Sequence, residues 1–179
     1  MKNFDINTTS FDGLFLIVRR KFSDNRGFLE KIYSEDIFNY LGIAIDDAYI
    51  TTSQRNVVRG LHHQSAPFGQ TKIVTCVSGN MIDLALDVRP DSRTFGKLFT
   101  YSLTANDCLS IVIPAGFSHG TISKSPNSMC LTLCGGAYLP QYEVGYHVDS
   151  WRHSSQLEGI DFDSLIYSEK DLKLPYFFT

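Results

Sequence analysis

The chain has 179 residues, of which 43% are hydrophobic and 20% are charged, and its formal net charge is −3. This length and composition are ordinary for one globular domain, and the slight negative charge excludes the basic footprint of a nucleic-acid-binding protein. Residues 1–20 lack the pattern of a signal peptide, and no apolar run approaches the roughly 20 residues of a membrane span. We therefore expect a cytoplasmic protein, folded as one domain over residues 1–179, with neither nucleic acid nor membrane among its partners.

The first predicted element is a helix over residues 35–41, which Ser34 can cap and Gly42 can end. Short β-type runs dominate the rest of the chain, with turns at 78–80 and 90–92, and their spacing of roughly ten residues is typical of a sandwich or barrel. A second helical turn is predicted to start at Ser168, and the less regular segment from Trp151 is expected to wrap over the barrel. The predicted strands are 57–64, 71–79, 80–89, 97–103, 108–114, 120–123 and 128–135.

The run over residues 80–89 alternates with a period of two, which predicts a strand with one buried face. The four cysteines lie in apolar or small-residue runs and form neither a CxxC pair nor a zinc pattern, so we expect buried free thiols. Together these patterns predict an all-β, antiparallel barrel or jelly roll with a pocket at its mouth.

Five short motifs resemble, in order and at similar spacing, those of the dTDP-4-dehydrorhamnose 3,5-epimerase family. The resemblance covers about residues 14–175. It implies a cupin-like jelly roll, usually a homodimer with exchanged N-terminal strands, that needs no cofactor or metal. The matching segments are Asp24 with Arg26-Gly27-Phe28, Arg59-Gly60-Leu61-His62-His63-Gln64, Asp87-Val88-Arg89 with Ser92 and Thr94 to Lys97, Pro114 to Gly120, and Ser168 with Lys170-Asp171.

The implied substrate is a nucleotide-linked 4-keto-6-deoxy sugar. Its C4 ketone acidifies the hydrogens at C3 and C5, so epimerisation requires a base, a proton donor across the ring and a cation or hydrogen bond at the enolate oxygen. By resemblance His62 is the base and Asp171 is the carboxylate that orients it. Lys72 and Arg59 match cationic groups around the keto sugar, and His119 and Arg26 match groups near the nucleotide pyrophosphate. Further substrate-binding candidates are Phe28, Gln64 and Tyr138.

Strand periodicity alone selects a different histidine. In a regular strand Arg59 shares a face with His63 rather than with His62. The motif selects His62, and a bulge at Gly60 would bring Arg59 and His62 to the same face.

Several residues depart from the family pattern where sugar and base would bind. Thr132 stands at the position of the proton-donating tyrosine, and an alkyl hydroxyl is a far weaker acid than a phenol. Asp47 and Tyr49 stand where the family commonly has Gln and Asn, and Glu30 or Lys31 must cover the position of a base-contacting Glu. We therefore expect an altered substrate, an altered reaction or both. The expected reaction is inversion at one centre only, or an isomerisation closely related to it, with Tyr138 and Tyr49 as the other candidate acids.

Two other classes remain open. A metal-dependent cupin enzyme would use His119 in the second half of a cupin metal pattern, but the first half requires HxH, and this chain offers adjacent His62 and His63. A non-catalytic sugar-nucleotide-binding protein would keep the barrel and lack the acid. A metal assay tests the former, and solvent deuterium exchange tests the latter.

Overall fold

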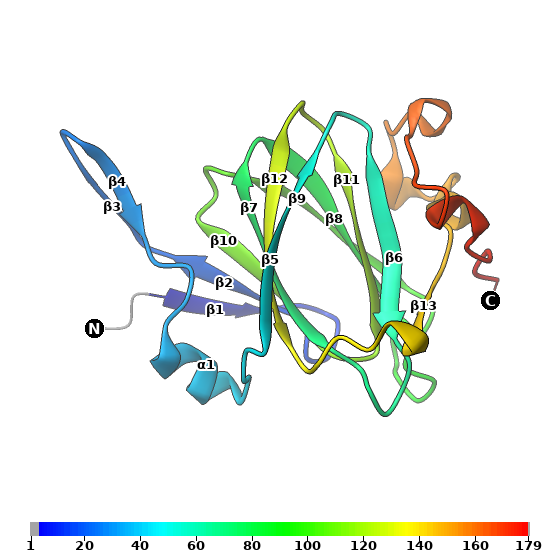
Figure 1. Ribbon diagram of the computed structural model, residues 1–179, viewed down its shortest axis with the longest axis horizontal. Helices are drawn as coiled ribbons and strands as arrows, with labels where there is room; N and C mark the ends of the chain where they lie inside the picture. Colours follow the sequence, from blue (N-terminus) through cyan, green and yellow to red (C-terminus); the bar gives the residue numbers. More distant parts are fainter. Residues whose placement is uncertain (1–3, 179) are drawn as a thin grey trace.

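The computed structural model describes residues 4–178, and most of its strands form two antiparallel sheets that face each other (Figure 1). The six-stranded sheet has the order β1-β2-β10-β7-β12-β5, and the five-stranded sheet has the order β13-β6-β11-β8-β9. The first sheet comprises β1 (Phe4–Thr8), β2 (Phe15–Arg19), β10 (Leu109–Ile113), β7 (Thr71–Ser78), β12 (Ser128–Gly135) and β5 (Asp47–Ser53). The second comprises β13 (Glu143–Gly145), β6 (Val58–Gln64), β11 (Phe117–Ser123), β8 (Asn80–Asp87) and β9 (Leu98–Thr104).

These two sheets confirm the predicted all-β, cupin-like jelly roll. The strand predicted at 128–135 and the helix predicted at 35–41 match β12 and α1 (Glu35–Leu41), and Gly42 ends the helix with a φ of 66°. Ser34 precedes the helix without a side-chain capping hydrogen bond. The strand predicted at 120–123 begins earlier, at Phe117. Four strands of these sheets have no counterpart in the sequence prediction, namely β1, β2, β5 and β13.

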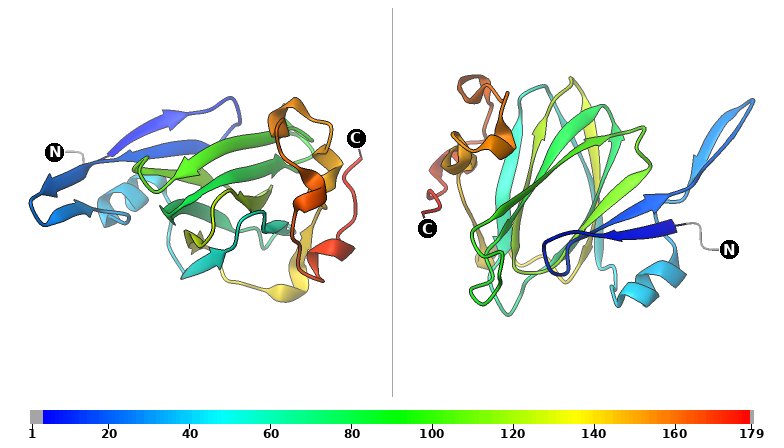
Figure 2. Two further views of the ribbon diagram at one scale, coloured as in Figure 1. Left: turned by 90° about the horizontal axis from the view of Figure 1, so that it is seen from above. Right: turned by 180° about the vertical axis from the view of Figure 1, so that it is seen from behind.

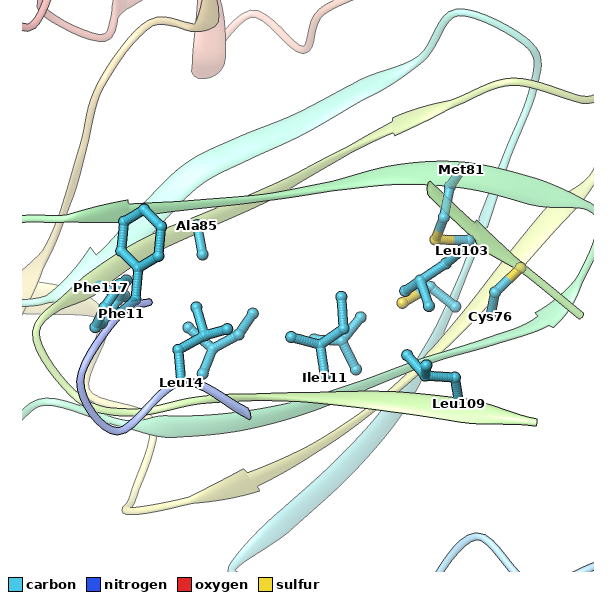
Figure 3. Close-up of a cluster of buried hydrophobic side chains, with 12 residues drawn as sticks. Phe11, Leu14, Cys76, Met81, Ala85, Leu103, Leu109, Ile111 and Phe117 are labelled. Atoms are coloured by element: carbon cyan, nitrogen blue, oxygen red, sulfur yellow. The ribbon is translucent and has the colours of Figure 1, made fainter. Parts of the chain in front are cut away.

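The apolar core lies between the two sheets (Figure 3). Alternate residues of each strand point inward, so the six-stranded sheet contributes Val74 and Ile111, and the five-stranded sheet contributes Ala85 and Leu103. Full burial of a Val, Leu or Ile side chain contributes about 1.5–3 kcal/mol to stability.

Both faces of β8 are buried, so the prediction of a half-buried strand was wrong. Its outward residues Leu84 and Leu86 pack against Val148, Leu157 and other residues of the C-terminal segment. The prediction that this segment wraps over the barrel is confirmed, and Figure 2 shows it covering one side of the sheets. The segment contains the short 3₁₀ turns η1 (Pro140–Tyr142), η2 (Val148–Trp151), η3 (Ser155–Leu157), η4 (Phe162–Ser164) and η5 (Asp171–Lys173).

The helical turn predicted at Ser168 begins three residues later, at Asp171 in η5, and the hydroxyl of Ser168 accepts a hydrogen bond from the Asp171 backbone at 3.0 Å. All four cysteines are free, as predicted, but Cys108 is only half-buried. Within residues 4–178 no helix has the length and apolar character that crossing a membrane requires.

A separate hairpin of β3 (Lys21–Asp24) and β4 (Gly27–Glu30) projects away from the barrel, on the side opposite the C-terminal segment (Figures 1 and 2). Three of its apolar side chains are largely exposed, namely Phe22, Phe28 and Leu29.

Candidate active site

Polar side chains replace the apolar core between β5 and β6. These strands lie at or next to one edge of each sheet, opposite the edges formed by β1 and β9. Inward positions on these strands and their neighbours bring together side chains from both sheets. They are Tyr49 on β5, Arg59 and His62 on β6, Lys72 on β7, Asp83 on β8, His119 on β11, and Thr132 and Cys134 on β12.

His62 and Asp171 form a hydrogen-bonded pair, with Nε2 of His62 2.8 Å from Oδ1 of Asp171. The Gly60 backbone N–H donates to the other carboxylate oxygen at 3.4 Å. Burial alone would raise the pKa of Asp171, but the hydrogen bond and charge of His62, together with Gly60 and Ser168, hold that pKa below its ordinary value. An ionised carboxylate therefore orients the His62 ring and stabilises the imidazolium that would form if His62 took a proton.

A bulge in β6 brings Arg59 and His62 to one cavity. The pairing of β6 with β11 shifts register between His119 and Thr121, opposite Gly60, whose φ is 106°. Arg59 and His62 consequently both line a cavity of about 410 Å³. The bulge at Gly60 that the sequence analysis required is present.

Arg59 is held in place by the end of β5. Its Nε donates to the Ser53 hydroxyl at 2.9 Å, and Nη2 donates to the Thr52 carbonyl at 3.0 Å. No acidic side chain in residues 4–178 forms an ion pair with it, so the guanidinium keeps a charge that can interact with an anion.

His63 lies on the other side of β6, where its ring stacks on Tyr146 with 6.2 Å between centroids. Burial, with the charges of Lys72 and His62, lowers the pKa of His63 to about 4, so this ring is neutral at pH 7. It lines a different cavity from His62, and the two rings therefore cannot ligate one ion.

His119 lies inside the barrel, directly across from His62 in the strand pairing. Its Nε2 is 2.7 Å from Oδ2 of the fully buried Asp83, whose other carboxylate oxygen has no partner in the described structure. The predicted role of His119 at a pyrophosphate stays a prediction.

Lys72 lines a neighbouring cavity of about 280 Å³. Its ammonium donates to the His62 carbonyl at 3.5 Å, and burial lowers its pKa. The other residues around this cavity are Asp47, Tyr49, Gln70, Cys134, Tyr138 and Glu143. The cavity thus contains the predicted residues Asp47, Tyr49 and Tyr138 beside a buried cation.

Thr132 and Tyr49 are directly paired across β12 and β5. Thr132 is buried, and it lies between Cys130 and Cys134 on the face that points into the barrel. Its partner Tyr49 therefore faces the same interior, because directly paired residues share a face of the sheet.

Four predicted residues lie on or beside the projecting hairpin, away from His62. Arg26 is exposed and forms an ion pair with Asp24, and Phe28 is exposed with the Lys21 ammonium over its ring. Glu30 forms an ion pair with the buried Arg19 at 2.7 Å, and Lys31 is exposed. Within one chain these residues do not meet the His62 cavity.

Gln64 holds two loops together. Its amide nitrogen donates to the carbonyls of Phe68 and Ala137 at 2.6 and 3.0 Å, and its oxygen accepts from the Leu139 N–H at 2.5 Å. Gln64 thereby fixes the segment that carries Tyr138, and its predicted contact with substrate stays a prediction.

Three site residues were not selected from the sequence. Glu143 lines the Lys72 cavity and forms an ion pair with Lys170, which lines the His62 cavity, and Asp83 is the partner of His119. The sequence could have indicated Asp83, because a carboxylate on the same strand face as the apolar Met81 and Ala85 is expected to be buried with a polar partner. Lys170 belongs to the matched segment Ser168 with Lys170-Asp171, whereas Glu143 carries no such signal.

No group of three or more His, Cys, Asp or Glu side chains in residues 4–178 is arranged to hold a metal ion. The expectation of a metal-independent protein stays a prediction.

Comparison with known proteins agrees with this geometry. The family model described as dTDP-4-dehydrorhamnose 3,5-epimerase matches residues 8–178. The chain belongs to this family. It is 32% identical over 178 residues to the dTDP-4-dehydrorhamnose 3,5-epimerase of Methanothermobacter thermautotrophicus, which covers 96% of this chain and 93% of the relative.

Solved structures of the family have the same fold. The dTDP-4-dehydrorhamnose 3,5-epimerase of Elizabethkingia anophelis matches with a TM-score of 0.86 and 29% identity, covering 98% of this chain and 97% of that one. The dTDP-6-deoxy-D-glucose-3,5-epimerase of Legionella pneumophila, in complex with dTDP-4-keto-L-rhamnose, matches with a TM-score of 0.83 and 27% identity, covering 98% and 100%.

Proposed function

We propose that this protein is an epimerase of a nucleotide-linked 4-keto-6-deoxy sugar, with His62 as the base. The observation that carries the proposal is the contact between His62 and the ionised Asp171, in a cavity that Arg59 also lines. The family relationship supports the substrate class, because the Legionella relative is in complex with a dTDP-linked 4-keto sugar.

Each charged group has a role in this reaction. His62 takes the hydrogen from the carbon beside the C4 ketone, and Asp171 stabilises the resulting imidazolium. Negative charge then develops on the C4 oxygen, where a cation in a water-poor site stabilises the enolate. Lys72 and Arg59 are the candidates for this stabilisation, because neither forms an ion pair within the described chain.

We propose inversion at one centre, C3 or C5. The small alkyl hydroxyl of Thr132 is too weak an acid to protonate an enolate efficiently. Strand β12 therefore supplies no acid that could reprotonate both C3 and C5. The nucleotide need not be thymidine diphosphate, because Glu30 is engaged with Arg19.

We further propose a cytoplasmic homodimer. The hairpin with its exposed Phe22, Phe28 and Leu29 would pack on a second copy of the chain. Exchange of this hairpin would place Arg26 and Phe28 against the partner, which accounts for their distance from His62 in one chain.

A deuterium exchange experiment tests the assignment of the base. Thymidine-, cytidine- and guanosine-linked 4-keto-6-deoxy sugars are each incubated with the protein in deuterium oxide and followed by NMR. His62→Ala should lower deuterium incorporation at C3 and C5 by about 100-fold or more, because the base is gone. His63→Ala, which removes the neutral ring on the other side of β6, should retain most of it. The reverse result would contradict the assignment.

The same assay separates the alternatives. Absence of exchange with any of the three sugars would indicate a binding protein that does not catalyse. Exchange that disappears with a chelator and returns with iron, manganese or zinc would indicate a metal-dependent enzyme.

A further inference from the structure

Inversion of a carbon centre requires two groups on opposite faces of the sugar ring. A base removes the proton from one face, and an acid returns a proton from the other. His62 belongs to β6 in the five-stranded sheet, so the acid must come from the six-stranded sheet, which forms the facing wall. Thr132 on that wall is too weak an acid, so the donor must be another group nearby.

Tyr49 is the phenol on that wall. It lies on β5, directly paired with Thr132, and it lines both the cavity of His62 and the cavity of Lys72. Among the described residues no other tyrosine lines both cavities.

We infer that Tyr49 is the proton donor of this enzyme. Its hydroxyl delivers the proton from β5 to the face of the sugar opposite His62. The inference depends on the proposed function and adds to it the identity of the acid.

Two neighbouring tyrosines fit this role less well. Tyr167 lines the His62 cavity, but its hydroxyl donates to Asp149 at 2.8 Å. Tyr138 lines only the Lys72 cavity and lies on the loop that Gln64 holds. Tyr49 faces the barrel interior from a strand, where backbone pairing fixes its position.

The local environment keeps the Tyr49 phenol protonated. Burial, with the nearby thiols of Cys134 and Cys130, raises its pKa, against the opposing effect of the Thr132 hydroxyl. A phenol with its ordinary pKa of about 10 is already protonated at neutral pH, so the acid form is available without this shift, which by itself makes the phenol a weaker acid. Thr132 acts as a partner of the phenol rather than as the acid itself.

The proton balance of the step is complete. The C–H bond breaks, its proton goes to Nδ1 of His62, because Nε2 donates its hydrogen to Asp171, and its electron pair forms the enolate with charge on the C4 oxygen. The enolate carbon then forms a new C–H bond with the Tyr49 hydroxyl proton, which leaves a phenolate. Proton exchange with water returns His62 to its neutral form and Tyr49 to the phenol.

The position of Tyr49 also fits inversion at one centre. Adjacent strands lie about 4.8 Å apart. A phenol on β5 therefore approaches the sugar ring from a position shifted by that distance relative to a phenol on β12. A displacement of this size favours one carbon of the ring over the other.

The test separates proton removal from inversion. Tyr49→Phe, in the full-length protein with the same three sugars in deuterium oxide, should lower the rate of inversion at least about 100-fold. Deuterium incorporation with retained configuration should stay within about tenfold, because His62 can remove a proton and return one to the same face. A merely structural defect would lower both rates together.

Two further variants complete the experiment. Tyr33→Phe removes a phenol on the outside, where the ring stacks on Phe38, and should leave both rates unchanged. The exchanged pair Tyr49→Thr with Thr132→Tyr returns a phenol to the same wall and should raise inversion above that of Tyr49→Phe, with folding checked by circular dichroism. Failure of the folded double variant to do so would contradict the inference.

The outcomes distinguish this inference from the proposed function. Full inversion by Tyr49→Phe would overturn the role of Tyr49 and leave the epimerase proposal intact. Absence of exchange by the unaltered protein with every sugar would overturn the epimerase proposal, and the inference with it.

Discussion

Lys72 combines a functional charge with a cost in stability. Its ammonium is buried and forms no ion pair in the described chain, and burial lowers its pKa below the ordinary value of 10.5. A folded state that lowers the pKa of a lysine is penalised while the lysine is charged, and the penalty disappears as pH rises toward the ordinary pKa.

Lys72→Met should therefore separate stability from activity. At pH 7 we expect the free energy of unfolding to rise by about 1–4 kcal/mol, by analogy with buried ion pairs that are replaced by apolar side chains of similar volume. The kcat/KM for epimerisation should fall by about 100- to 1000-fold, because the charge at the enolate is lost. Urea unfolding and the NMR assay measure the two effects.

The stability gain of Lys72→Met should shrink as pH rises toward the ordinary lysine pKa of 10.5, because the unaltered lysine then loses its charge. Lys97→Met, at an exposed lysine, is the control and should change stability by less than about 0.5 kcal/mol. A gain in stability that is independent of pH would contradict the explanation by burial of charge.

Strand β6 places the catalytic candidates through its bulge at Gly60. A Cβ atom at this position would lie 2.4 Å from the His119 carbonyl oxygen and 2.8 Å from the Gly120 Cα, and the φ of 106° disfavours any other residue. The close approach of β6 and β11 therefore requires glycine, and this approach turns Arg59 and His62 toward the same cavity.

Gly60→Ala should lower the free energy of unfolding by about 3 kcal/mol or more, from backbone strain together with overpacking. Gly159 provides a matched control, because its φ is also positive, at 79°, and nothing lies within 4 Å of its added Cβ. Gly159→Ala should cost only about 1–2 kcal/mol. Equal losses for the two variants in urea unfolding would show that the contact with β11 is unimportant.

At the scale of the whole molecule, the hairpin of β3 and β4 exposes large apolar side chains to solvent. Phe28 and Leu29 are 62% and 58% exposed, although apolar side chains of this size are usually covered. A second copy of the chain would cover them if the protein is a homodimer.

Light scattering tests this assembly. The unaltered protein should have twice the chain mass of 20.2 kDa, and Phe28→Ser with Leu29→Ser should shift it to the mass of one chain. Phe178→Ser, at a side chain that is 85% exposed near the C-terminus, should leave the dimer unchanged. A monomeric unaltered protein would contradict the proposal.

The sequence by itself determined the kind of fold and most of the chemistry. The alternation over 80–89 and the run at 128–135 predicted strands because inward and outward residues repeat every second position. The segment from Arg59 to Gln64 and the later Asp171 indicated an epimerase-like site because their residue types match the family motifs. These signals are local, and each can be recognised within about ten residues of chain.

Only the tertiary structure decided which residues meet. His62 and Asp171 are 109 positions apart, and their contact depends on the path of the C-terminal segment across the five-stranded sheet. That same segment buries the outer face of β8, which no alternation within the strand predicts. The pairing of Tyr49 with Thr132 depends on the register between β5 and β12, and the common face of Arg59 and His62 depends on a register shift against β11. Periodicity along a strand fixes which residues share its faces, but pairing between distant strands fixes what those faces contact.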